Sequence, residues 1–247
     1  MTVAVAGLCR HPIKGIGREA LAEVVLAAAQ GLPFDRHWAV AHEAARLVPG
    51  WNPCTSFLRG AKAPALMAVE ASLQGDAVTL RHPDHPALTF RPDQTDDLPR
   101  LLDWLAPLQP PGRAAPAGIV RADRAMTDSD YPSVSIISLA SCRALGEAMG
   151  LPPLDQRRFR GNLILDGLEP FAEFDWVGQQ LQIGEAVLEV VERIGRCRAT
   201  SANPDTGVID ADTLGALKSH YGHQDFGISA RVATGGTVRL GDTVQVR

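Results

Sequence analysis

The sequence lacks the features that mark several classes of protein. Its 247 residues contain only four cysteines, Cys9, Cys54, Cys142 and Cys197, and no two of them are spaced as C-x-x-C. A structural zinc site needs clustered ligands at short spacing, so none is predicted. The cysteine density is also too low for a disulfide-stapled secreted domain, and reduced thiols in a cytoplasmic protein fit best.

Long apolar runs and an excess of positive charge are missing too. No stretch approaches the ~20 apolar residues that span a bilayer. No basic leader precedes the short apolar start at residues 3–9, so we expect neither a signal peptide nor a membrane partner. The formal net charge is −4, which argues against a general nucleic-acid binder.

What the chain does contain is enough apolar material for a core, with 45% hydrophobic and 21% charged residues. Short apolar runs separated by Gly, Pro and Asp predict many strands, including residues 3–9 and hairpins at 66–82 and 181–195. Helical spacing of apolar residues predicts a few helices, at 95–107, 141–150 and 210–222. The predicted class is mainly β with α (α+β).

A segment rich in Pro, Ala and Gly, residues 107–118, is the best candidate for a linker or surface loop. It predicts two domains, 1–105 and 106–247. Many short strands with glycine turns suggest barrels or strongly bent sheets. We therefore expect a β-barrel-like first domain and a second β-barrel with a few peripheral helices.

One cysteine stands between two permanent cations. Arg196 and Arg198 flank Cys197 in the stretch GRCRATSANPDTG. Neighbouring cations favour the thiolate, which can act as a nucleophile or bind a soft metal. The alternative is a small buried residue that ends a strand, and for an isolated cysteine this alternative is the more common case.

Three other segments place a cation or an amide at a turn beside a strand. They contain Lys14, Arg36, and the pair Arg160 and Asn162 on either side of a glycine. Such donors, together with exposed backbone N–H groups, suit an anionic and polar ligand. Taken singly, each of these charges is more often a solvated surface group.

Together these segments resemble one family, the MOSC proteins. The resemblance is to the branch with an N-terminal MOSC β-barrel domain, which includes the mitochondrial amidoxime reducing component and bacterial homologues. It spans residues 3–246, and the Arg-Cys pair followed by Asn-Pro-Asp-Thr-Gly is its most specific part. The matching segments are HPIKG, GLPFDRHWAV, RFRGNLILDGLEPFAEFDW, LQIGEAVLEVV, GRCRATSANPDTG and GGTVRLGDTVQV.

The resemblance implies a molybdenum cofactor of the molybdopterin type. Cys197 matches the cysteine that binds the metal and is the expected catalytic residue, and Arg196 matches the arginine before it, which would keep the thiol ionised. Family positions that hold the pterin and its phosphate correspond to Lys14, Arg36, Arg160 and Asn162. In the segment DSDYPSVSIIS the family's hydroxyl positions fall on Tyr131 and Pro132, so Ser133 is expected to take their place.

The sequence also departs from the family pattern. Gly15 stands where many relatives have Ser, and Gly195 stands where many have Ser or Tyr. The stretch Arg46 to Pro64 matches poorly, and if this loop shapes the substrate entrance, the specificity differs.

The implied function is a molybdenum-dependent oxidoreductase that reduces N-hydroxylated, amidoxime-type small molecules. The sequence has no Cys-rich segment for an iron–sulfur cluster and no flavin or nicotinamide fingerprint, so an external electron-transfer protein is expected as the donor. Pyridoxal phosphate is not expected. The alternatives are a non-catalytic carrier of the cofactor, a sulfur-transfer protein, and a degenerate member that binds no cofactor.

Overall fold

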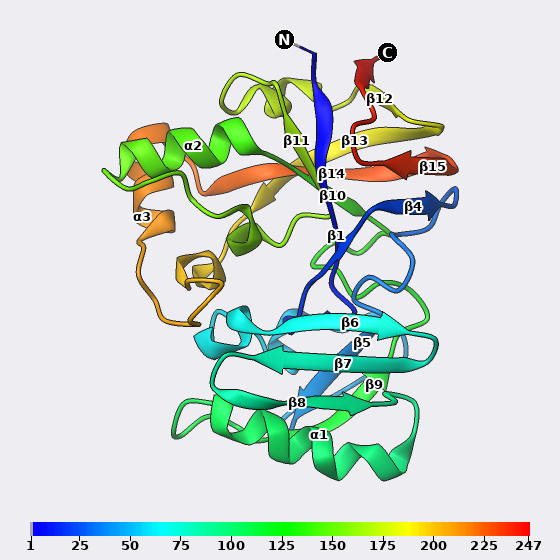
Figure 1. The fold of residues 1–247 in the computed structure, drawn as a ribbon, viewed down its shortest axis with the longest axis vertical. Helices are drawn as coiled ribbons and strands as arrows, with labels where there is room; N and C mark the ends of the chain where they lie inside the picture. Colours follow the sequence, from blue (N-terminus) through cyan, green and yellow to red (C-terminus); the bar gives the residue numbers. More distant parts are fainter. Residues whose placement is uncertain (1) are drawn as a thin grey trace.

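The computed structural model describes residues 2–247, and most of its regular structure is strand. Two lobes are stacked along the long axis of the molecule, each built around its own sheets (Figure 1). The predicted class, mainly β with a few helices, is confirmed.

The upper lobe contains an eight-stranded sheet that curls into a half-barrel. All its pairings are antiparallel except β10 with β11. Its strands, in spatial order, are β16 (Val244–Val246), β12 (Gln180–Ile183), β13 (Ala186–Gly195), β14 (Asp225–Thr234), β10 (Val134–Ser138), β11 (Leu163–Asp166), β1 (Ala4–Arg10) and β3 (Glu19–Leu21). A two-stranded sheet of β4 (Glu23–Leu26) and β15 (Gly236–Arg239) accompanies it.

The longest ladder, between β13 and β14, is irregular. Its register shifts three times, between Val187 and Leu188, between Val190 and Glu192, and between Arg193 and Gly195. Each such bulge bends the strand and increases its twist. The last two lie just before Cys197, where they redirect the end of β13 toward the lower lobe.

The lower lobe contains two three-stranded sheets and one helix. An antiparallel meander is formed by β6 (Glu70–Gln74), β7 (Ala77–His82) and β8 (His85–Phe90). The second sheet has the order β2 (Ile13–Lys14), β5 (Trp38–His42), β9 (Pro116–Arg121). Helix α1 (Leu98–Leu105) buries Leu101 and Leu105 in the core of this lobe.

The remaining helices belong to the upper lobe (Figure 1). Helix α2 (Leu139–Ala148) is capped by Ser138, whose hydroxyl accepts a hydrogen bond from the Ala140 N–H; the sequence offers both Ser138 and Ser141 as caps, and the structure has the first. Helix α3 (Thr213–Ala216) is short and continues as a π-helical segment, Leu217–Tyr221. The 3₁₀ segments include Cys54–Ser56, Gln156–Phe159 and Arg198–Ser201.

The chain passes between the lobes more than once. Strand β1, from the first third of the chain, pairs with β11 of the upper lobe, whereas β9 pairs with β5 in the lower lobe. The predicted linker, residues 107–118, therefore ends inside a strand from Pro116 onward. The domain division between residues 105 and 106 stays a prediction. In space, strand β1 from the first half of the chain lies in the upper lobe, and strand β9 from the second half lies in the lower lobe.

Candidate functional site

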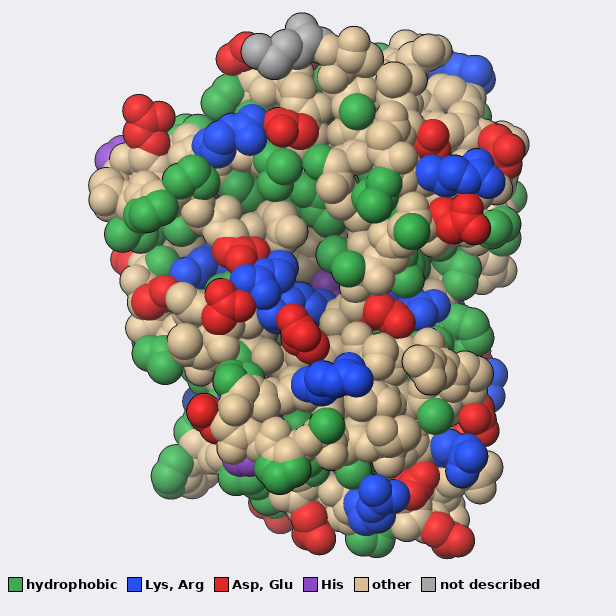
Figure 2. Space-filling model, in the orientation of Figure 1, with side chains coloured by type: hydrophobic (Ala, Val, Ile, Leu, Met, Phe, Trp, Pro, Cys, Tyr) green, Lys and Arg blue, Asp and Glu red, His purple; other side chains and the backbone are tan. Residues whose placement is uncertain are grey.

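A polar pocket of about 270 Å³ lies where segments of both lobes meet. Four arginines line it against two carboxylates, so its formal charge is positive. On the face shown in Figure 2, basic and acidic side chains gather at the level where the lobes join. The lining residues are Arg36, Thr127, Asp128, Ser129, Ser133, Ser135, Arg160, Asn162, Glu192, Arg193, Ile194, Gly195, Arg196 and Ser229.

Two of these arginines have an unusual backbone conformation. Arg36 has a φ of 49° and Arg160 a φ of 50°, both in the left-handed region. A side chain other than glycine costs about 1–2 kcal/mol there. The Arg36 guanidinium donates to the Arg160 carbonyl at 3.0 Å, which joins the two turns. Strained residues often cluster at ligand-binding sites, and here the strain places two guanidinium groups side by side.

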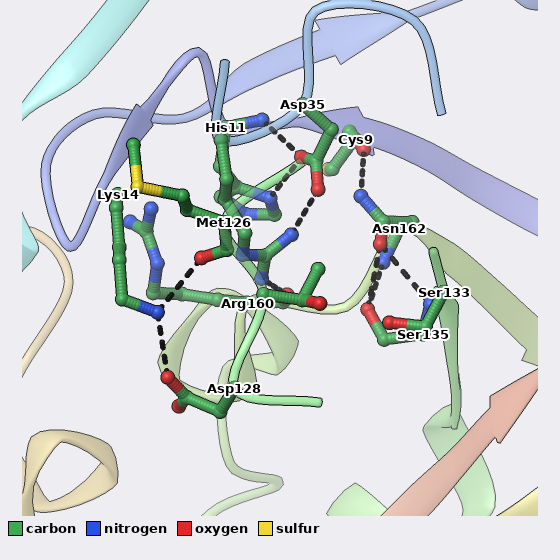
Figure 3. A network of polar contacts seen from close by, with 12 residues as sticks. Cys9, His11, Lys14, Asp35, Met126, Asp128, Ser133, Ser135, Arg160 and Asn162 are labelled. Carbon is green, nitrogen blue, oxygen red and sulfur yellow. Dashed lines mark hydrogen bonds and ion pairs between the residues drawn. The ribbon is translucent and has the colours of Figure 1, made fainter. Parts of the chain in front are cut away.

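A buried carboxylate holds Arg36 from behind. Asp35 is 1% exposed, and Figure 3 shows it facing His11. Its Oδ1 accepts from the His11 N–H at 2.8 Å and lies 3.3 Å from His11 Nδ1, while its Oδ2 pairs with Arg36 Nη1. Burial alone would raise the pKa of Asp35, but Arg36 and the His11 hydrogen bonds hold it below its ordinary value. Asp35 is therefore an anion that positions Arg36.

Arg160 remains a cation in spite of its surroundings. Burial and the neighbouring Arg36 lower its pKa to about 9, which is still above neutrality. Its Nη1 donates to the Gly17 carbonyl at 3.0 Å. Burial of His11 itself, aided by the neighbouring charge of Arg160, lowers the pKa of His11 to about 3, so this imidazole is neutral in the folded protein.

Lys14 lies beside the pocket and does not line it. Its ammonium donates to the Met126 carbonyl at 2.7 Å and to Asp128 Oδ1 at 2.6 Å (Figure 3). Burial lowers the pKa of Lys14, and the Asp128 carboxylate opposes that shift. Lys14 thus reaches the pocket through Asp128, with one of its three N–H bonds still free for a ligand.

Asn162 is fully buried and its amide is largely occupied by the fold. Its Oδ1 accepts from the Ser135 hydroxyl at 2.8 Å and from the Ser135 N–H at 3.1 Å. Its Nδ2 donates to the Cys9 carbonyl at 3.1 Å, so Asn162 ties β11 to β1 and β10 (Figure 3). Only one N–H of the amide is left to face a ligand.

Hydroxyl groups from one loop line the pocket next to these cations. Thr127, Ser129 and Ser133 form a chain, with Oγ–Oγ distances of 3.0 and 2.8 Å. The Tyr131 hydroxyl donates to Glu192 Oε1 at 2.7 Å, and burial together with Glu192 raises the pKa of Tyr131 to about 12. Ser133 thus lines the pocket, while Tyr131 keeps its proton and restrains Glu192.

Cys197 follows directly on two residues that line the pocket, Gly195 and Arg196. It is exposed, so the alternative of a small buried residue is wrong. Within residues 2–247, no protein group forms a hydrogen bond to its thiol. Arg196 donates to the Phe226 carbonyl at 2.7 Å and to the Phe159 carbonyl at 2.8 Å. Burial lowers the pKa of Arg196 to about 10, so it is charged and mainly anchors the cysteine turn.

The two glycines that depart from the family pattern differ in their surroundings. Gly15 has a φ of +74°, and a Cβ there would lie 2.6 Å from the Leu58 carbonyl oxygen. This backbone therefore excludes a serine. At Gly195 the nearest atom to an added Cβ is Asp225 Oδ1, at 3.7 Å, so the missing side chain simply leaves the pocket wider.

The poorly matched stretch after Arg46 also reaches this region. The Trp51 indole N–H donates to the Thr127 carbonyl at 3.3 Å, which ties this loop to the hydroxyl loop. Asp128, Ser129 and Ser135 also line the pocket, and they lie in the segment DSDYPSVSIIS, from which the sequence selected Ser133 alone. Tertiary structure adds pocket residues that the sequence did not single out: Thr127, Glu192, Arg193, Ile194 and Ser229. The hydroxyl-rich run before Ser135 was a usable signal, but nothing in the sequence pointed to Ser229.

Five predicted residues thus line one pocket: Arg36, Ser133, Arg160, Asn162 and Arg196. Cys197 is the next residue in the chain after Arg196, and Lys14 reaches the pocket through Asp128. Their roles toward a cofactor stay predictions. Within residues 2–247, His, Cys, Asp and Glu side chains form no group of three or more that could hold a metal ion. In the same range no helix has the length and apolar character needed to cross a membrane.

Comparison with known proteins gives two family matches that together cover nearly the whole chain. Residues 2–105 match the MOSC N-terminal beta barrel domain, and residues 123–245 match the MOSC domain. The solved structure of the YuaD protein from Bacillus subtilis aligns with 100% of this chain and 96% of its own, at a TM-score of 0.49 and 13% identity. A likeness at that level carries no argument here.

Several curated relatives are mitochondrial amidoxime-reducing components. Component 1 of Danio rerio is 24% identical over 87% of this chain and 74% of its own length. The Homo sapiens protein is 30% identical over 52% of this chain, and the Xenopus laevis protein is 33% identical over 46%. The matched segments span only 41% and 37% of those two relatives. From the two domain matches, the chain belongs to the MOSC family, in the branch with an N-terminal MOSC β-barrel domain.

Proposed function

We propose that this protein is a molybdenum-cofactor-dependent reductase of N-hydroxylated compounds that receives electrons from a separate protein. The observation that carries the proposal is an exposed thiol, Cys197, that directly follows Arg196 in the chain, and Arg196 lines a pocket together with three other arginines. The names of the amidoxime-reducing relatives support the substrate class. A cytoplasmic location belongs to the same proposal, supported by four cysteines that are all free thiols.

The residues present fit such a cofactor. A phosphorylated pterin needs cations for its phosphate and hydrogen-bonding groups for its ring, and a thiolate suits molybdenum. Arg36 and Arg160 would hold the phosphate, because both line the pocket and the Arg36 guanidinium donates to the Arg160 carbonyl. The hydroxyls of Ser129 and Ser133 would pair with ring edges. Cys197 would bind the metal.

When bound, this cofactor supplies the two-electron chemistry that cleaves an N–O bond. The chain's own residues do the rest. Asp35 fixes Arg36, while the carbonyls of Phe159 and Phe226 fix Arg196 and with it the turn that carries Cys197. Tyr131 holds its proton on the phenol oxygen against Glu192, which orients that carboxylate at the pocket wall.

Metal analysis and pterin fluorescence test the proposal on protein made in a host that synthesises the cofactor. We expect bound molybdenum and pterin in the wild type, and loss of the metal in Cys197→Ala. Cys142→Ala is the matched control, because Cys142 is buried in the core away from the pocket. Wild-type protein that contains neither molybdenum nor pterin would refute cofactor binding.

Turnover separates the enzyme from the alternatives. With reduced viologen as artificial reductant, loaded wild-type protein should convert benzamidoxime to benzamidine. Loaded protein that shows no turnover would instead be a carrier or a sulfur-transfer protein. Reduction with NADH and no other component would contradict the need for an external electron donor.

A further inference from the structure

A second pocket, of about 250 Å³, lies in the lower lobe between the end of β5 and the start of β9. It shares no lining residue with the pocket beside Cys197. Its walls come from the 3₁₀ segment Cys54–Ser56, the loop that follows it and the segment before β9. The lining residues are His42, Thr55, Phe57, Leu58, Arg59, Lys62, Gln109, Arg113 and Ala114.

The charges in this second pocket are all of one sign. Arg59, Lys62 and Arg113 line it, and no carboxylate does. Over residues 2–247, none of these three cations forms an ion pair with an acidic side chain. In a concave site, charges of one sign focus the electric field and attract a counter-ion. An anion would supply the counter-charge that no carboxylate of the lining provides.

Two polar atoms in the same wall lack a partner in the described chain, and the donor among them, Gln109 Nε2, points to the same conclusion, whereas His42 Nδ1 is an acceptor because Nε2 carries the proton. Gln109 Nε2 and His42 Nδ1 are inaccessible and pair with no other group of the described chain. The other ring nitrogen of His42 lies 2.8 Å from the Thr55 carbonyl and donates to it, which fixes the ring orientation. Buried polar groups are normally satisfied, so a ligand or solvent oxygen belongs next to Gln109 Nε2.

We propose that this second pocket binds a small phosphate-bearing anion. Phosphate suits it better than a carboxylate, because three cations and an amide donor surround a small volume and two of the cations are guanidinium groups. The Thr55 hydroxyl adds a further donor. The proposal is independent of the molybdenum-dependent function, since none of its residues has a role there.

Isothermal titration with inorganic pyrophosphate at low ionic strength tests this site. Lys62 and Arg113 are exposed, so the double variant Lys62→Gln/Arg113→Gln is expected to fold normally. We expect the wild type to show a binding event that the double variant weakens at least about tenfold. Arg46→Gln/Lys218→Gln is the matched control: it removes the same charge from exposed positions outside both pockets.

The titration can contradict the proposal in three ways. Equal binding by the wild type and the Lys62→Gln/Arg113→Gln variant would show that pyrophosphate binds elsewhere, for instance at Arg36 and Arg160. An equal loss in the control variant would show that net charge alone decides the affinity. Tighter binding of malonate than of pyrophosphate would overturn the phosphate assignment.

Discussion

Replacing Asp35 by asparagine probes how the arginine pocket is held in place. Asparagine has the same shape but no charge. Its Oδ1 can still accept from the His11 N–H, whereas its NH₂ group would face the donors of Arg36. The substitution therefore breaks a buried ion pair and places two donors against each other.

Removing one partner of a fully buried ion pair costs about 3–5 kcal/mol. Asp35 meets that condition with a side chain that is 0% exposed, but Arg36 is 14% exposed and can recover some hydration. We therefore expect a loss of about 2–3 kcal/mol in the free energy of unfolding near pH 7. For a chain of this size the melting temperature would fall by roughly 5–10 °C.

Urea denaturation followed by circular dichroism measures this loss. Asp76→Asn is the control: Asp76 and its partner Arg91 are 73% and 58% exposed, so breaking their pair should cost less than about 1 kcal/mol. The folded-state pKa of Asp35 is below its unfolded value near 3.9, so its contribution is present above about pH 4 and disappears as the pH falls further. If Asp35→Asn is as stable as the wild type near pH 7, the carboxylate does not position Arg36 as described.

Three further predictions follow from the backbone and from His11. Gly15→Ser should lose at least about 2 kcal/mol of stability, because Gly15 has a φ of +74° and the added Cβ would meet the Leu58 carbonyl. Gly195→Ser should change stability by less than about 0.5 kcal/mol, because the nearest atom to an added Cβ there, Asp225 Oδ1, is 3.7 Å away. Equal melting temperatures of the two variants would contradict this. The His11 imidazole stays neutral in the folded protein down to about pH 3, whereas in the unfolded chain it takes up a proton below about pH 6.5. The stability of the wild type should therefore fall as the pH is lowered from about 6.5 towards 3. His11→Asn should show a shallower fall in urea denaturation, and an unchanged dependence on pH would refute the reasoning. Arg160→Gly should melt above Arg160→Ala by the equivalent of about 1 kcal/mol, since residue 160 has a φ of 50°, although both variants lose the guanidinium; the reverse order would mean that the turn changes its conformation.

Local sequence patterns predicted the elements well where period and turn residues agreed. Alternating burial in β4 and β7, and glycine at the predicted hairpin turns, follow directly from the strand pattern. The helix at 210–222 is the instructive exception. Its pattern was helical, but only Thr213–Ala216 is α-helical, and the following residues widen into a π-helical segment. Helix ends depend on packing that a one-dimensional pattern does not contain.

The candidate site shows the same division. Residue types at turns, taken together with the resemblance of their segments to the family, marked Arg36, Arg160, Asn162 and Cys197. Their use could not be read from the pattern. The Asn162 amide forms most of its hydrogen bonds with Ser135 and Cys9, and the Lys14 ammonium donates to Met126 and Asp128. Those partners lie more than a hundred residues away in three of the four cases.

The amino-acid sequence by itself determined the class of fold, most of the strands, the Arg-Cys and turn motif around Cys197 and the family. Tertiary structure alone decided which lobe each segment joins, that Arg36 and Arg160 share a left-handed backbone and one wall, and that three cations of the lower lobe surround a second pocket. The physical reason is that periodicity and turn chemistry act over a few neighbouring residues, whereas burial, charge pairing and cavity shape depend on contacts between segments far apart in the chain.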